Sequence, residues 1–158
     1  MHKGRLAGAA LAALLATSTA GGATVPPAAG TYLARLTVVQ ATGTQCPVQR
    51  GDHFHGVVHY PGFTANRITI RAPIELDGYP AIDTVVMTIT SGAGTVKPSG
   101  RFLEQIVGGP FDVKVTGSFA AVLTLTDDPK TFTVRLSEKA TSVDCDAVVD
   151  IALVQSGP

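Results

Sequence analysis

Three of the four histidines in this chain fall within seven residues, at His53, His55 and His59. If this segment is a β-strand, residues two apart share a face, so all three imidazoles point to one side with Val57 between them. The i, i+2 spacing of His53 and His55 allows both imidazole nitrogens to bind one metal ion. His59 lies about 13 Å beyond His55 along an ideal strand. One ion therefore reaches all three only if the strand bends at Gly56.

A metal site built on this strand needs a further ligand, either Asp52 or a carboxylate from elsewhere in the chain. The ion expected with imidazole ligands is a divalent transition metal. The same pattern also describes a half-buried strand whose polar face meets solvent, while Phe54, Val58 and Tyr60 pack into the core. The sequence leaves both interpretations open.

Cys46 and Cys145 are the only cysteines, so one intramolecular disulfide is the only pairing available to the chain. A redox motif would favour C-x-x-C spacing, which is absent. Cys46 follows the first expected strand and Cys145 precedes the last, so the bond would join the two ends of a sheet. For a loop near 100 residues, chain entropy gives the bond about 4–5 kcal/mol as an upper estimate. We therefore predict a structural disulfide.

The N-terminus has the order of a secretory signal peptide. Lys3 and Arg5 are followed by an apolar run over residues 6–16 and then by small residues up to Ala23. The sequence thus predicts a signal peptide over residues 1–23 and export to the periplasm or the extracellular medium, where disulfides persist. No later segment is apolar for long enough to span a membrane.

Residues 24–30 are predicted to be a Pro/Ala linker and residues 31–158 a single β domain. Segments rich in Val, Thr and Ile recur there, separated by Gly, Pro, Asn and Asp. The predicted strands cover residues 31–40, 54–60, 67–74, 84–90, 111–116, 120–126, 131–139 and 147–155. The segment 99–107 is predicted to be a helix that ends at Gly108-Gly109-Pro110. Alternation of apolar and polar residues indicates antiparallel sheets, and about eight short strands indicate an up-and-down β-barrel or a β-sandwich.

Gly30-Thr31-Tyr32, at the start of the first long strand, resembles the G-x-W start of lipocalin-like and avidin-like meander β-barrels, with Tyr in place of Trp. The resemblance implies an up-and-down barrel whose lumen holds a small apolar ligand.

The charge of the chain and the absence of known motifs argue against several classes of function. Lys3 and Arg5 belong to the signal peptide, so residues 24–158 carry 12 − 2 = 10 basic and 12 acidic side chains. Without a basic block, nucleic acid is not an expected partner. There is no G-x-S-x-G or phosphate-binding loop, and no paired-carboxylate spacing among Glu75, Glu104 and Glu138. We therefore expect no catalytic residues. The leading expectation is a binding or structural module for a small apolar ligand or a protein partner. A metal-binding protein is second, and a hydrolytic or redox enzyme third.

Overall fold

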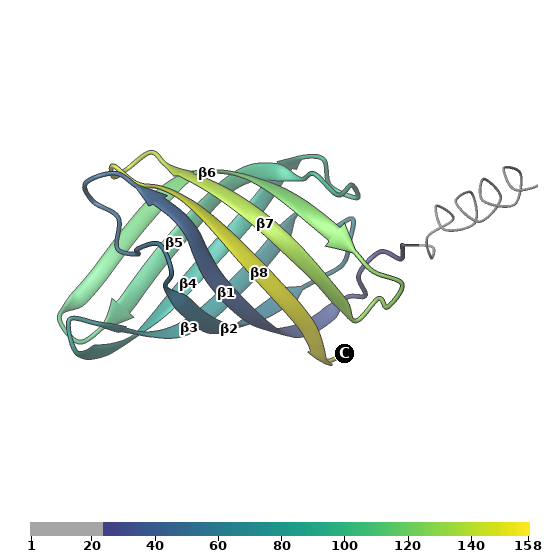
Figure 1. Cartoon of the computed structure of the whole chain (residues 1–158), viewed down its shortest axis with the longest axis horizontal. Coiled ribbons are helices and arrows are strands. Elements are labelled where there is room, and N and C mark those ends of the chain that lie inside the picture. Colours follow the sequence, from purple (N-terminus) through teal and green to yellow (C-terminus); the bar gives the residue numbers. More distant parts are fainter. Residues whose placement is uncertain (1–23) are drawn as a thin grey trace, which may run out of the picture.

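The chain folds into a closed antiparallel β-barrel (Figure 1). Along the strands, side chains that point into the lumen alternate with side chains that point outward. The computed structural model describes residues 24–158, so the predicted signal peptide lies outside the described residues. The strands are β1 Gly30–Thr42, β2 His53–Tyr60, β3 Arg67–Leu76, β4 Tyr79–Ser91, β5 Ser99–Gly108, β6 Phe111–Leu125, β7 Thr131–Ala140 and β8 Asp146–Gly157. Each strand pairs with the next, and β1 pairs with β8. The prediction of about eight antiparallel strands is confirmed, and the sheet is a barrel, not a sandwich.

The predicted helix over residues 99–107 is wrong, because this segment is strand β5. Phe102 and Ile106 are buried in the lumen, whereas Arg101 and Leu103 are exposed on the outer surface. This is a period of two, as a strand requires. Glu104 lies between the two buried residues, and its charge obscured the apolar face of the strand.

Residues 111–116 and 120–126, predicted to be two strands, form the single long strand β6. Gly117 lies on the inner face of β6 at a point of close approach. A Cβ atom there would lie 2.2 Å from the carbonyl oxygen of Lys139 and 2.6 Å from the ring of Phe102. The glycine that suggested a strand break is thus a packing requirement within one strand.

The barrel has two different ends, which Figure 1 shows at the right and left of the view. The N-terminal end carries residues 24–29 and the connections 61–66, 92–98 and 126–130. The disulfide end carries the connections 43–52, 77–78, 109–110 and 141–145. Cys46 and Cys145 are bonded there with their Cα atoms 4.8 Å apart, so the predicted disulfide is confirmed.

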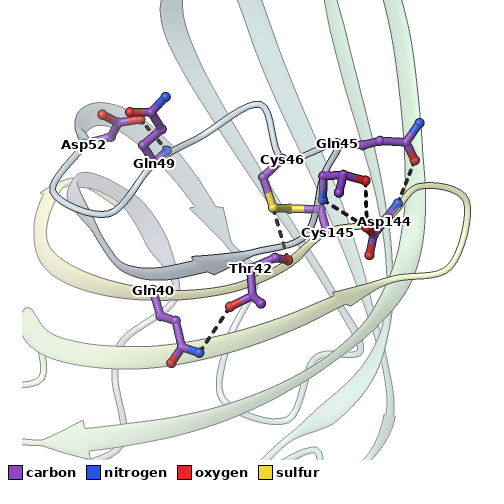
Figure 2. Close-up of a disulfide and its surroundings, with 9 residues drawn as sticks. Gln40, Thr42, Gln45, Cys46, Gln49, Asp52, Asp144 and Cys145 are labelled. Atoms are coloured by element: carbon purple, nitrogen blue, oxygen red, sulfur yellow. Dashed lines mark hydrogen bonds between the residues drawn. A yellow bond between two sulfur atoms is a disulfide. The ribbon is translucent and has the colours of Figure 1, made fainter.

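Hydrogen bonds join the same two loops beside the disulfide (Figure 2). The backbone N–H of Gln45 donates to the carbonyl oxygen of Asp144 at 3.0 Å, and the N–H of Asp144 donates to Oε1 of Gln45 at 2.9 Å. Oδ2 of Asp144 accepts from the backbone N–H and the hydroxyl of Thr44. These two bonds hold the pKa of Asp144 below its usual value. The first and last hairpin loops are therefore fixed to each other.

Aromatic rings fill the lumen near the N-terminal end. The ring centroids of Tyr32 and Phe132 are 5.3 Å apart, and Tyr60 lies within 6.0 Å of both. Tyr32 is fully buried, and its hydroxyl donates to the carbonyl oxygen of Ala28 at 2.6 Å. The carbonyl oxygen of Pro129 lies 3.2 Å from the same hydroxyl and is a second acceptor. The hydroxyl thus ties the segment before β1 and the β6–β7 turn to the core.

Replacing Tyr32 by Phe is expected to lower the free energy of unfolding by about 1–2 kcal/mol, because the partly buried carbonyl oxygen of Ala28 loses this donor. Urea denaturation measures the change. Tyr79→Phe is the control, because Tyr79 is half exposed and packs on Phe111 through its ring alone. The control is expected to change stability by less than about 0.5 kcal/mol. Equal effects of the two substitutions would rule out a structural role for the Tyr32 hydroxyl.

Candidate functional site

The histidines of β2 lie on the outer surface of the barrel. His53, His55 and His59 are exposed, while Val58 and Tyr60 point into the lumen and are buried. Nδ1 of His53 lies 3.2 Å from the hydroxyl of Thr37 on β1. The structure thus places the three imidazoles on one face of one strand, in contact with solvent.

The neighbours of the histidines do not complete a metal site. His55 stands opposite Arg35 in the β1–β2 register, so a cationic side chain is its cross-strand neighbour. Oδ2 of Asp52 accepts from the backbone N–H of Gln49 at 2.8 Å, within the loop before β2. In residues 24–158, no three His, Cys, Asp or Glu side chains form a group that could hold a metal ion. Metal binding by His53, His55, His59 and Asp52 stays a prediction.

The barrel lumen contains two cavities. The one toward the N-terminal end, here called the apolar chamber, leaves about 60 Å³ for the centres of water-sized molecules. At this end of the barrel the connections 61–66 and 92–98 line it, and the backbone N–H of Gly94 donates to the carbonyl oxygen of Phe63 at 2.9 Å between them. Its walls are Val58, Tyr60, Ile68, Ile70, Met87, Ile89, Ala121, Leu123, Phe132, Val134, Leu136, Ile151 and Leu153 from strands, with Gly62, Phe63, Ala93, Gly94, Thr95 and Pro98 from the two loops.

The second cavity, here called the acidic chamber, lies toward the disulfide end and leaves about 90 Å³. Ile70 and Leu136 line both chambers, so the two adjoin along the barrel axis. Pro47 and Val48, from the loop that the disulfide fixes, cover the acidic chamber. Most of its remaining walls are aliphatic or aromatic: Leu36, Val38, Phe54, Ala72, Val85, Phe102, Val115, Ala140, Val143, Ala147 and Val149.

Three carboxyl groups project into the acidic chamber from three strands. Asp83 is on β4, Glu104 on β5 and Glu138 on β7. Oδ1 of Asp83 is fully buried and has no hydrogen-bond partner within residues 24–158. Among the side chains that the structure describes, no Lys, Arg or His lines either chamber. The lumen therefore concentrates acidic groups in apolar surroundings without a counterion from the protein.

These surroundings shift two of the carboxyl groups strongly. Burial raises the pKa of Asp83 to about 8, and the nearby charge of Glu104 adds to the rise. Burial likewise raises the pKa of Glu138 to about 7, again assisted by Glu104. A desolvated carboxylate beside a like charge is unfavourable, so both groups bind their protons more tightly than in water. Such pKa values mark the acidic chamber as the candidate functional site.

An opening at the disulfide end, here called the acidic mouth, leads to the same carboxyl groups. Asp83 and Glu104 line it from inside, and Asp52, His53 and Glu75 stand around it. Pro47, Val48, Phe54, Ile74, Leu76 and Ile106 supply its apolar walls. The mouth gives Asp83 and Glu104 a route to solvent, whereas Glu138 does not line it.

The sequence did not predict this cluster of carboxyl groups. For two of its members, a different local feature concealed that the side chain points into the lumen. Asp83 lies one residue before the predicted strand 84–90, and Glu104 lies in the segment predicted to be helical. Glu138 carried a usable signal: it continues the inward series of Phe132, Val134 and Leu136. An acidic residue that continues the inward apolar series of a strand indicates a carboxyl group in the lumen.

Comparisons with known proteins found no match: no protein-family model, curated protein or solved structure is similar to this chain. The resemblance of Gly30-Thr31-Tyr32 to lipocalin-like and avidin-like barrels therefore stays a prediction. Across residues 24–158 there is no helix of the length and apolarity needed to cross a membrane.

Proposed function

We propose that this protein is an exported binding protein that holds a small, largely apolar ligand in its lumen. The observation that carries the proposal is the apolar chamber, whose strand-borne walls are aliphatic and aromatic side chains and whose outer end is lined by two loops. An apolar cavity of about 150 Å³ stays dry and takes up benzene, and the two adjoining chambers together have about this volume. An eight-stranded barrel is also about wide enough for one small ligand.

The size of the chamber limits the ligand. A water molecule needs roughly 10–15 Å³ of such centre-accessible space, so the two chambers together suit a molecule of about ten non-hydrogen atoms. The order of residues 1–23 supports export, and the Cys46–Cys145 disulfide is compatible with it. We therefore place the binding event in the periplasm or the extracellular medium.

Toluene is a suitable probe of the apolar chamber. The chain contains only two methionines, Met1 and Met87, and Met87 lines the chamber. A ¹³C-methyl label on methionine therefore reports the lumen through the signal of Met87, beside a second signal from Met1. Titration with toluene is expected to shift that signal saturably, with a Kd of about 1 mM or tighter for a ligand of this size.

Filling the chamber provides the matched test. Ala121 is buried against the chamber, whereas its neighbour Ala120 is exposed on the outer surface of β6. Ala121→Leu is expected to weaken toluene binding at least tenfold, and Ala120→Leu to leave it unchanged. Val58→Leu is the second filling variant if Ala121→Leu fails to fold. Equal toluene affinity in the folded filling variants and the wild type would disprove lumenal binding.

A further inference from the structure

We infer that the ligand of this barrel is a cationic amphiphile: an ammonium group on a small apolar body, with the nitrogen between Asp83 and Glu138 and the body in the apolar chamber. This inference rests on the proposed function and names the chemical class of its ligand.

The first support is the distribution of charge along the lumen. Asp83, Glu104 and Glu138 come from three different strands and converge on one cavity, and no basic side chain of the described residues lines it. Acidic groups inside proteins are normally paired with a cation or a donor. Here no basic side chain of the described residues lines the chamber, so the chamber is electrostatically complementary to a cation from outside.

The second support is the unsatisfied oxygen of Asp83. Oδ1 has no accessible surface and no hydrogen-bond partner within residues 24–158, although it belongs to a side chain that lines the chamber. A buried acceptor without a donor is costly, and native proteins contain few of them. An ammonium group carries three donors. Oδ1 of Asp83 has no surface open to the chamber, so it meets these donors only when the carboxyl group turns, and the side chain of Glu138 forms no hydrogen bond among the described residues.

The third support is that the two chambers adjoin. Ile70 and Leu136 belong to the walls of both, so a ligand whose head lies at the carboxyl groups reaches the apolar chamber by passing these two side chains. The route inward is acidic as well, because Asp52 and Glu75 stand at the acidic mouth and His53 is its only basic-type side chain. An acidic mouth attracts cations and repels anions.

An ammonium head also fits better than a metal ion. No three of the His, Cys, Asp and Glu side chains in residues 24–158 come close enough to hold a metal ion. The remaining walls of the acidic chamber are apolar, which suits the carbon atoms next to an amine. When the cation enters, a protonated carboxyl group gives its proton to solvent, and the carboxylate that remains pairs with the ammonium group.

Three probes with alkyl chains of similar length distinguish the contribution of the charged head group from that of the apolar body. They are heptylamine, heptanol and heptanoate. The Met87 methyl signal and isothermal titration calorimetry at pH 7 give the affinities. Heptylamine is expected to bind at least about tenfold more tightly than heptanol, since charge-assisted hydrogen bonds exceed neutral ones. Heptanoate is expected to bind at least about tenfold more weakly than heptanol. Calorimetry in two buffers of different ionisation enthalpy is expected to show proton release with heptylamine alone.

The variant Asp83→Asn/Glu138→Gln removes the two carboxyl groups proposed to hold the nitrogen and keeps the size of their side chains, while Glu104 remains in the chamber. It is expected to abolish the advantage of heptylamine over heptanol while heptanol still binds. Asp146→Asn is the control, because Asp146 is exposed at the start of β8, and it is expected to retain the advantage. Glu138→Gln alone is the second variant if the double variant does not fold.

The outcomes distinguish this inference from the proposed function. If toluene and heptanol bind but heptylamine has no advantage, or keeps it in the double variant, the cationic ligand is disproved and the apolar binding site stands. If none of the probes binds in the lumen, both fail.

Discussion

Raising the pH from 5 to 9 is expected to lower the free energy of unfolding of this barrel by about 3–5 kcal/mol. Asp83 and Glu138 have pKa values raised to about 8 and about 7 by burial in the acidic chamber. One unit of pKa shift corresponds to about 1.4 kcal/mol. Because the two groups interact with Glu104, their contributions do not simply add. Few single features of a domain this size would move its stability as far.

The sign follows from proton binding. In the unfolded chain both carboxyl groups titrate near pH 4, and in the folded barrel they keep their protons to about pH 7 and 8. Between these limits the folded state holds more protons, so stability falls as the pH rises. The contribution of these two groups to the free energy of unfolding is fully present below pH 4 and is lost by about pH 8. Asp144 and Asp150 have lowered pKa values and act in the opposite direction, but only at acidic pH.

Urea denaturation at pH 5, 7 and 9 measures this dependence. Asp83→Asn/Glu138→Gln is expected to remove most of it and to be more stable than the wild type at pH 9, since the carboxylates of Asp83 and Glu138 no longer have to be desolvated. Asp146→Asn is expected to keep the wild-type dependence. A double variant with the same pH profile as the wild type would mean that these carboxyl groups are not buried as described.

Loss of the Cys46–Cys145 disulfide is expected to destabilise the barrel by about 3–5 kcal/mol. The bond closes a loop with a sequence separation of 99 residues, and a crosslink over such a length greatly restricts the unfolded chain. It also fixes the loop that carries Pro47 and Val48 over the acidic chamber. The hydrogen bonds between Gln45 and Asp144 remain, but they are exposed and hold the loops only weakly.

The variant Cys46→Ser/Cys145→Ser tests this in urea at pH 6, where the carboxyl groups of the lumen remain largely protonated. Its midpoint is expected to fall by more than about 1 M, given the usual dependence of stability on urea. Treatment of the wild type with a reducing agent is expected to give the same midpoint. A change below about 1 kcal/mol in both experiments would contradict a structural role for the bond.

The sequence predicted those parts of the fold in which the local alternation of apolar and polar residues matches the side of the barrel that each residue takes. Phe132, Val134 and Leu136 alternate with polar residues and form a strand as expected. Two cysteines, one after the first strand and one before the last, allow a single pairing, and this bond is present in the barrel. In contrast, residues 99–107 could not be assigned correctly, because the inward Glu104 breaks the apolar series of β5.

The candidate site was harder to predict for a related reason. The histidines of β2 stand out in the sequence, yet they lie on the outer surface, where each meets solvent. Asp83, Glu104 and Glu138 are far apart in the sequence and become neighbours only when β4, β5 and β7 close around the lumen. Local patterns show which face a residue takes, but they do not show which residues share a cavity.

A crystal structure of the full chain with heptylamine tests the central claim most directly. The account predicts density for one ligand in the lumen, with its nitrogen about 2.7–2.9 Å from a carboxyl oxygen of Asp83 or Glu138. Its carbon atoms are predicted to pass Ile70 and Leu136 toward Met87. A lumen without ligand at saturating heptylamine, or heptylamine bound only on the outer surface, would contradict the account.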